Sequence, residues 1–227
     1  MILEVCCGNI QSVRAAVQGG AQRVELCRNL ELDGLTPDPQ TISQAIALCH
    51  PAGVRVHVLI RPREENFVYS TEELNQMLAD ISTALQLGAD GIVIGALTPD
   101  GDIDTVQTGQ MVQYARQCNR QGSITFHRAF DVCNNPLQAL EQIIRLGCDR
   151  ILTSGQQATA EQGIPLLKEL VRKASGRITI LCGAGVTPDN AASILRGTGA
   201  TELHGSLRTG SVTDPSKVAC LIHNVTK

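Results

Sequence analysis

The chain has few aromatic residues and no tryptophan: aromatic side chains make up 2% of its 227 residues. Platforms on which nucleic-acid bases could stack are therefore poorly supplied. Long basic runs are also lacking, because 19 Lys and Arg residues oppose 22 Asp and Glu residues without long runs of one sign, although a local basic cluster is compatible with this balance. We expect no nucleic-acid partner, and a core built from aliphatic side chains.

Long apolar runs are missing as well. No uninterrupted apolar stretch approaches the roughly 18 residues of a membrane span, and the first strand-like segment starts at Met1 or Ile2, so we expect no signal peptide or anchor. The nine cysteines form no CxxC pair and lie in apolar contexts, which favours free thiols over a disulfide framework. We therefore expect no membrane partner and a reducing, cytoplasmic location.

A short segment rich in β-branched residues, followed by a helical pattern, recurs eight times along the chain. The predicted strands are residues 2–6, 23–27, 54–60, 91–95, 123–127, 150–154, 177–182 and 201–204, and the predicted helices are residues 10–18, 41–49, 71–87, 105–118, 136–146, 160–174, 188–195 and 215–225. This alternation predicts an α/β fold, a (β/α)8 TIM-type barrel that forms a single domain over residues 1–227. A doubly wound open sheet is the alternative, but the turn at residues 6–9 lacks its glycine-rich fingerprint.

Polar side chains alternate with apolar ones in the first predicted strands. Glu4 and Cys6 share one face of the first strand, and Arg23, Glu25 and Cys27 share one face of the second. The valines and leucines between them are suited to face the helices, so we expect the polar set to point into the barrel. Buried charges are costly unless paired, which indicates a structural ion-pair network. The alternative is that Glu4 or Glu25 acts as a general acid or base.

The C-terminal ends of the strands should hold the functional groups, because barrels place them there. Arg61 and Arg63 flank a proline, and their guanidinium groups are suited to bind a carboxylate or phosphate. His127 is a candidate proton carrier, beside Arg128 as a further cation and Asp131 as a candidate orienting carboxylate. The alternative is that these charges only form salt bridges between loops.

Small residues end the last three predicted strands. Loops after strands seven and eight of a barrel often bind phosphate through backbone N–H groups, and small residues let the ligand approach. The predicted anion-binding residues at these ends, in addition to the three arginines, are Ser154, Gly183, Gly185, Gly205 and Ser206.

Cys6 and Cys27 are the candidate metal ligands. They end neighbouring predicted strands on the same face, and two soft thiolates suit Cu(I). Alternating layers of inward side chains would offset the two sulfurs in height, and a buried cysteine that packs as a small hydrophobe is the alternative. Clustered oxygen ligands and the close Cys/His spacing of zinc sites do not occur in the sequence. The other seven cysteines are predicted to be packing residues.

Several strings together resemble one known family. They are Glu4-Val5-Cys6, Arg23-Val24-Glu25-Leu26-Cys27, Gly34-Leu35-Thr36-Pro37, Ile60-Arg61-Pro62-Arg63, Thr125-Phe126-His127-Arg128-Ala129-Phe130-Asp131, Ile151-Leu152-Thr153-Ser154-Gly155 and His204-Gly205-Ser206. Over nearly its whole length the chain resembles the CutC copper-homeostasis family. The resemblance implies a (β/α)8-type barrel, a cytoplasmic location and a homodimer. It also implies an association with copper tolerance and Cu(I) binding, in which Cys6 and Cys27 match the cysteine positions proposed for the metal.

Three hypotheses about function follow. The first is a copper-handling protein that binds Cu(I) at the cysteine pair. The second is a barrel enzyme that acts on a small phosphorylated or carboxylated metabolite, with the arginines gripping the anion and His127 or a glutamate moving protons. The third is a non-catalytic scaffold. The expected ligand is therefore a copper ion or a small anion, and no organic cofactor is evident.

Overall fold

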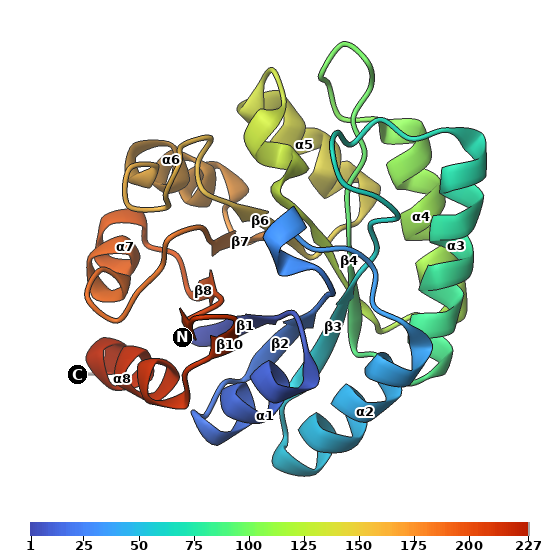
Figure 1. Ribbon diagram of the computed structural model, residues 1–227. Coiled ribbons are helices and arrows are strands. Elements are labelled where there is room, and N and C mark those ends of the chain that lie inside the picture. Colours follow the sequence, from blue (N-terminus) through green and yellow to red (C-terminus); the bar gives the residue numbers. More distant parts are fainter. Residues whose placement is uncertain (227) are drawn as a thin grey trace.

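The computed structural model describes residues 1–226, in which eight parallel strands close into a barrel (Figure 1). Each strand pairs with the next in the chain, and β8 pairs with β1 to complete the closure. The predicted (β/α)8 barrel is confirmed. Its strands are β1 (Ile2–Cys7), β2 (Arg23–Leu26), β3 (Arg55–Leu59), β4 (Gly91–Ile94), β5 (Ser123–Phe126), β6 (Arg150–Thr153), β7 (Thr179–Cys182) and β8 (Glu202–Gly205).

The helices form a ring outside the strands (Figure 1). Local sequence fixes many of their ends: Ser70 and Glu73 form a capping box at the start of α3, and Gly147 ends α5 in the left-handed region, at φ 87°. Among residues 1–226, none of the helices has the length and apolar character needed to cross a bilayer. The α-helices are α1 (Ile10–Gln18), α2 (Pro39–Cys49), α3 (Thr71–Gln86), α4 (Thr105–Cys118), α5 (Pro136–Leu146), α6 (Ile164–Ala174), α7 (Ala191–Thr198) and α8 (Pro215–Thr226).

Most boundaries lie within one or two residues of their predicted positions, and two helices differ more. Helix α7 spans Ala191–Thr198 and not the predicted residues 188–195, because Thr187 and Asn190 hydrogen-bond to each other in a turn before it. Helix α6 begins at Ile164 and not at the predicted residue 160. Just before it, Gly163 packs so closely on the loop after β6 that a Cβ there would lie 1.8 Å from the Ser154 carbonyl oxygen. A short hairpin that was not predicted follows β8, with strands β9 (Arg208–Thr209) and β10 (Val212–Thr213).

Side chains alternate between two apolar clusters, as the sequence predicts for the first three strands. The large cluster between strands and helices contains Val5, Val56 and Val58, together with Cys7. The small cluster inside the barrel is formed by Cys6, Cys27, Leu59 and Val93, with Leu30 packed against it. The apolar part of the interior is small because charged residues occupy the rest.

All nine cysteines, each within residues 1–226, are free thiols. The prediction that seven of them are packing residues is wrong for two, because Cys118 and Cys220 are exposed. Both lie on outer helices, where apolar neighbours in the sequence did not reveal which face they occupy.

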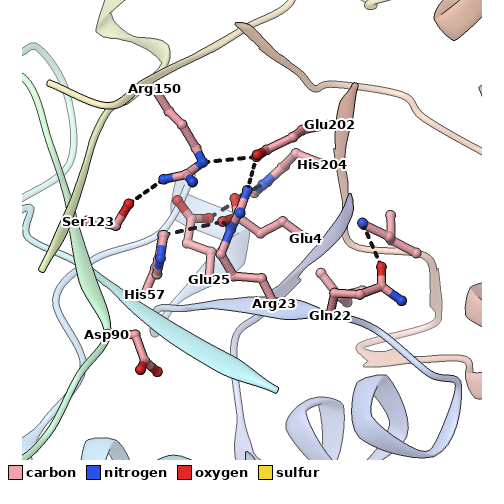
Figure 2. A network of polar contacts seen from close by, with 12 residues as sticks. Glu4, Gln22, Arg23, Glu25, His57, Asp90, Ser123, Arg150, Glu202 and His204 are labelled. Atoms are coloured by element: carbon pink, nitrogen blue, oxygen red, sulfur yellow. Dashed lines mark hydrogen bonds and ion pairs between the residues drawn. The ribbon is translucent and has the colours of Figure 1, made fainter. Parts of the chain in front are cut away.

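The charged residues inside the barrel form a paired network (Figure 2). Arg23, which is 1% exposed, donates to the carboxylates of Glu4 and Glu202. Arg150 also donates to Glu202, at 2.9 Å, and to Ser123. These residues come from five different strands, and four of them begin their strands, so the network ties the strands together at the end opposite the barrel mouth. Pairing offsets the cost of burying these charges.

Replacing Arg23 with Met keeps a long aliphatic side chain but removes the charge between Glu4 and Glu202. Because a buried carboxylate then loses its partner, we expect the free energy of unfolding to fall by about 3–5 kcal/mol in urea unfolding followed by circular dichroism. The control, Arg177→Met, breaks the exposed ion pair with Glu141 and should cost about 1 kcal/mol or less. Equal losses in the two variants would contradict a special role for the buried network.

Candidate functional site

A cavity of about 520 Å³ opens at the mouth of the barrel. Its wall includes nine of the residues predicted from the sequence: Cys6, Glu25, Arg61, His127, Arg128, Asp131, Gly185, Gly205 and Ser206. Five other predicted residues lie outside this wall: Glu4, Cys27, Arg63, Ser154 and Gly183. The strand ends thus bring most, but not all, of the predicted residues to one cavity.

The two predicted metal ligands lie side by side. The Sγ atoms of Cys6 and Cys27 are 3.9 Å apart, although adjacent strands were expected to offset them in height. This separation is less than twice a metal–thiolate bond of about 2.3 Å, so one ion can contact both sulfurs. Cys6 is 6% exposed and reaches the cavity, whereas Cys27 is fully buried behind it. The hydrogen bond between the thiols and their burial raise the pKa of Cys6 well above its usual value.

Glu4 lies at the centre of the polar contacts below the cavity. One of its oxygens accepts from Arg23, and the other lies 2.8 Å from Nδ1 of His204. The burial of Glu4 by itself would raise its pKa, but Arg23, His204 and His57 outweigh this effect and hold the pKa well below its usual range. Glu4 is therefore a permanent carboxylate that orients its neighbours, and it does not itself reach the cavity.

His204 and Glu25 lie beside Glu4 (Figure 2), and both line the cavity. Nε2 of His204 lies 3.7 Å from Oε2 of Glu25. Burial alone would lower the pKa of His204, but the carboxylates of Glu25 and Glu4 raise it. Burial raises the pKa of Glu25. Unlike Glu4, whose charge is fixed, Glu25 is thus shifted toward its neutral form and His204 toward its protonated form.

His204 is a functional candidate that the sequence analysis missed. It was recognised only as part of a glycine-rich strand end, yet it alternates with Glu202 on the inward face of β8. Alternation on the eighth strand was the signal that would have found it. One ligand atom each from Cys6, Glu25 and His204 lie within 4.8 Å of one another, a group that could hold a metal ion. A search for closely spaced Cys and His residues in the sequence could not find this group, because the three residues come from separate strands.

The predicted arginine pair contacts the protein's own loops. Arg61 lies on the cavity wall, but its guanidinium group donates to the carbonyl oxygens of Leu32 and Gly34 at 3.0 and 3.1 Å. Arg63 does not line the cavity, and it donates to Glu73 and to the Val68 carbonyl oxygen. Both arginines therefore hold loops at the mouth in place, Arg63 through a salt bridge with Glu73 and Arg61 through carbonyl oxygens.

His127 and Asp131 lie on the same loop but do different things. Nδ1 of His127 accepts from the Ala129 N–H at 3.1 Å, and burial and the charge of Arg61 lower the pKa of His127 to about 3. The imidazole is therefore neutral at pH 7. Asp131 accepts from the Ser154 N–H at 3.0 Å, from the Thr153 hydroxyl and from Arg128. It ties the loop after β6 to its own loop, and within the described residues it forms no hydrogen bond with His127.

The small residues at the mouth divide in the same way. Gly185, Gly205 and Ser206 line the cavity. Gly183 makes room beneath it, because a Cβ there would lie 2.6 Å from Leu152 and 3.3 Å from the Cβ of His204. The hydroxyl group of Ser154 donates to the Gln157 carbonyl oxygen and so closes its own loop.

Comparison with known proteins identifies the family. The model of the CutC family matches residues 1–209. The chain belongs to the CutC family. A relative from Pasteurella multocida, named family protein CutC, is 50% identical over 204 residues, which cover 90% of this chain and 81% of the relative. A second, from Bacteroides thetaiotaomicron, is 52% identical over 205 residues, covering 90% of this chain and 80% of the relative.

The solved structures agree with this family. A CutC protein from Streptococcus agalactiae with a proposed role in copper homeostasis is 35% identical, with a TM-score of 0.84 over 91% of this chain and 98% of that chain. Thiamine phosphate pyrophosphorylase from Pyrococcus furiosus has a TM-score of 0.68 over 99% of this chain and 95% of that chain, at 17% identity. The second likeness shows the fold alone. The family resemblance seen in the sequence is therefore confirmed.

Replacing Asp131 with Ala tests its role as a tie between loops. The buried Thr153 hydroxyl and the Ser154 N–H would lose their acceptor, so we expect the free energy of unfolding to fall by about 1–3 kcal/mol. The control, Arg128→Ala, removes the exposed partner of the same carboxylate and should cost about 1 kcal/mol or less. If urea unfolding gives the two variants equal stability, Asp131 does not act as this tie.

Proposed function

We propose that this chain takes part in copper homeostasis by binding Cu(I) between Cys6 and Cys27. The observation that carries the proposal is the 3.9 Å separation of the two sulfurs at the mouth end of neighbouring strands. Soft thiolates prefer Cu(I) over the harder cations. The family of the chain supports the same function, since the related protein from Streptococcus agalactiae has a proposed role in copper homeostasis.

The surroundings of the pair suit a soft monovalent ion. Leu59 and Val93 form one buried apolar cluster with the two cysteines, which limits the access of water. An ion that enters from the cavity would meet Cys6 first, because Cys27 is fully buried behind it. Free thiols at all nine cysteines fit the reducing environment of the cytoplasm, which we include in the proposal. The homodimer implied by the family resemblance stays a prediction.

The two other hypotheses have less support. The open cavity fits an enzyme for a small phosphorylated or carboxylated metabolite, but the arginines that should grip the anion already donate to loop carbonyls and to Glu73. A closed barrel mouth would be expected of a non-catalytic scaffold, whereas this mouth holds a cavity of about 520 Å³. Cu(I) binding at the cysteine pair therefore remains the proposal.

An anaerobic competition titration of the reduced protein against a chromophoric Cu(I) chelator tests the site. We expect Cys6→Ser and Cys27→Ser each to weaken Cu(I) binding by more than about 100-fold, because each removes a ligand directly. The matched control is Cys7→Ser, since Cys7 neighbours Cys6 in the chain but faces the helices. Equal Cu(I) affinity in wild type and the Cys6→Ser/Cys27→Ser double variant would overturn the proposal.

The same titration should depend on pH. A thiol must lose its proton before it binds a metal ion, and Cys6, whose pKa is raised, holds its proton through the neutral range. Apparent Cu(I) affinity should therefore rise at least about tenfold per pH unit between pH 6 and 7.5, after correction for the protonation of the chelator. A flat profile would show that binding releases no proton, and so does not use the Cys6 thiolate.

A further inference from the structure

We propose that Cys6, Glu25 and His204 form a second metal site, a three-ligand site for a divalent ion of the zinc class that opens to the cavity. The proposal goes beyond Cu(I) binding, because it involves another class of ion and two ligands outside the cysteine pair. The two sites share Cys6, so one site excludes the other in a given molecule.

Neighbouring strands bring the three residues together. In the register of the barrel, Cys6 of β1 pairs with Glu25 of β2, and Glu4 of β1 pairs with His204 of β8. Side chains from these three adjacent strands converge, and one ligand atom from each lies within 4.8 Å of the others. All three residues line the cavity, so an ion has a route to them.

The imidazole of His204 is oriented by a carboxylate, as metal-binding histidines commonly are. Its Nδ1 lies 2.8 Å from Oε1 of Glu4, and Glu4 in turn accepts from the buried Arg23. A metal-binding imidazole commonly donates its second ring N–H to a carboxylate, which fixes both the tautomer and the orientation of the ring. With Nδ1 committed to Glu4, Nε2 is the free nitrogen, and it is the atom that faces Glu25 at 3.7 Å.

Glu25 is a buried carboxylate without a strong partner. It is 5% exposed, and its side-chain partners are the thiol of Cys6 and the imidazole of His204, whose Nε2 lies 3.7 Å away. The arginines of the barrel network contact Glu4 and Glu202 instead. A buried carboxylate is costly unless it is paired or coordinates a metal. A cation between Glu25, Cys6 and His204 would supply the missing partner.

The mixed donor set indicates which class of ion fits. A thiolate, an imidazole and a carboxylate are all ligands of Zn²⁺, and sites with three protein ligands leave a fourth position for water or substrate. Cu(I) favours the two thiolates, so a Cu(I) site would not use His204 and Glu25 as ligands. The fourth position would face the cavity of about 520 Å³, where water or an oxygen atom of a small molecule could complete the coordination.

Titration of the reduced, metal-free protein with Co(II) tests the site, because Co(II) replaces Zn(II) and absorbs light when a thiolate binds it. We expect one equivalent of Co(II) to give a thiolate-to-cobalt charge-transfer band, and one equivalent of Zn(II) to abolish it. His204→Gln should weaken Co(II) binding by at least about 100-fold. Cys27→Ser is the matched control, and it should retain Co(II) affinity within about threefold while losing Cu(I) affinity.

Two results would overturn the proposal: no charge-transfer band in the wild type, or a Cys27→Ser variant that loses Co(II) as strongly as His204→Gln. Thermal unfolding of each variant shows whether it is folded. Should His204→Gln fail to fold, Glu25→Gln replaces it, and Co(II) affinity within threefold of wild type would then overturn the proposal. The Cu(I) proposal fails separately, if Cys27→Ser leaves Cu(I) affinity unchanged while the Co(II) results hold.

Discussion

The pairing of charges inside the barrel is the interaction on which the rest of the structure depends. Glu4 is fully buried, yet it contacts Arg23 on one side and His204 on the other. Arg23 continues to Glu202, and Glu202 to Arg150, so strands that are far apart in the sequence share one network. An unpaired charge at this depth would cost more than the network contributes, so the barrel closes in the register that completes the pairs.

The same network links the stable end of the barrel to its mouth. Below Glu4, the contacts of Arg23 join the beginnings of the strands; above it, His204 and Glu25 reach the cavity. A histidine fixed in this way offers Nε2 to a ligand, and it loses little conformational entropy when the ligand binds. The residues that stabilise the fold are thus also those that orient the candidate site, which is why Arg23 matters for both.

Strand periodicity made much of this arrangement predictable. Alternation in residues 2–6 and 23–27 placed Cys6 and Cys27 inside the barrel, as the structure has them. The Cys6–Glu25–His204 group could not be predicted from the sequence, because it depends on which residues of β8, β1 and β2 lie level with one another. The partners of Arg61 and Arg63 depend on loop conformation, and local sequence does not encode which carbonyl group a guanidinium meets.

Cys6 is a candidate ligand for both Cu(I) and a divalent ion, and the charges buried around it favour one ion or the other. A Cu(I) ion held by two thiolates carries one net negative charge, which the nearby carboxylate of Glu25 would oppose unless His204 stays protonated. A divalent ion and the single thiolate of Cys6 together carry one net positive charge, which the carboxylate of Glu25 balances. Binding of this ion also requires that His204 has lost its proton on Nε2. The two ions therefore place opposite demands on one histidine. The charge of Glu25 and the hydrogen bond that His204 donates to Glu4 favour the protonated histidine, so an ion at the mixed site must displace the proton on Nε2.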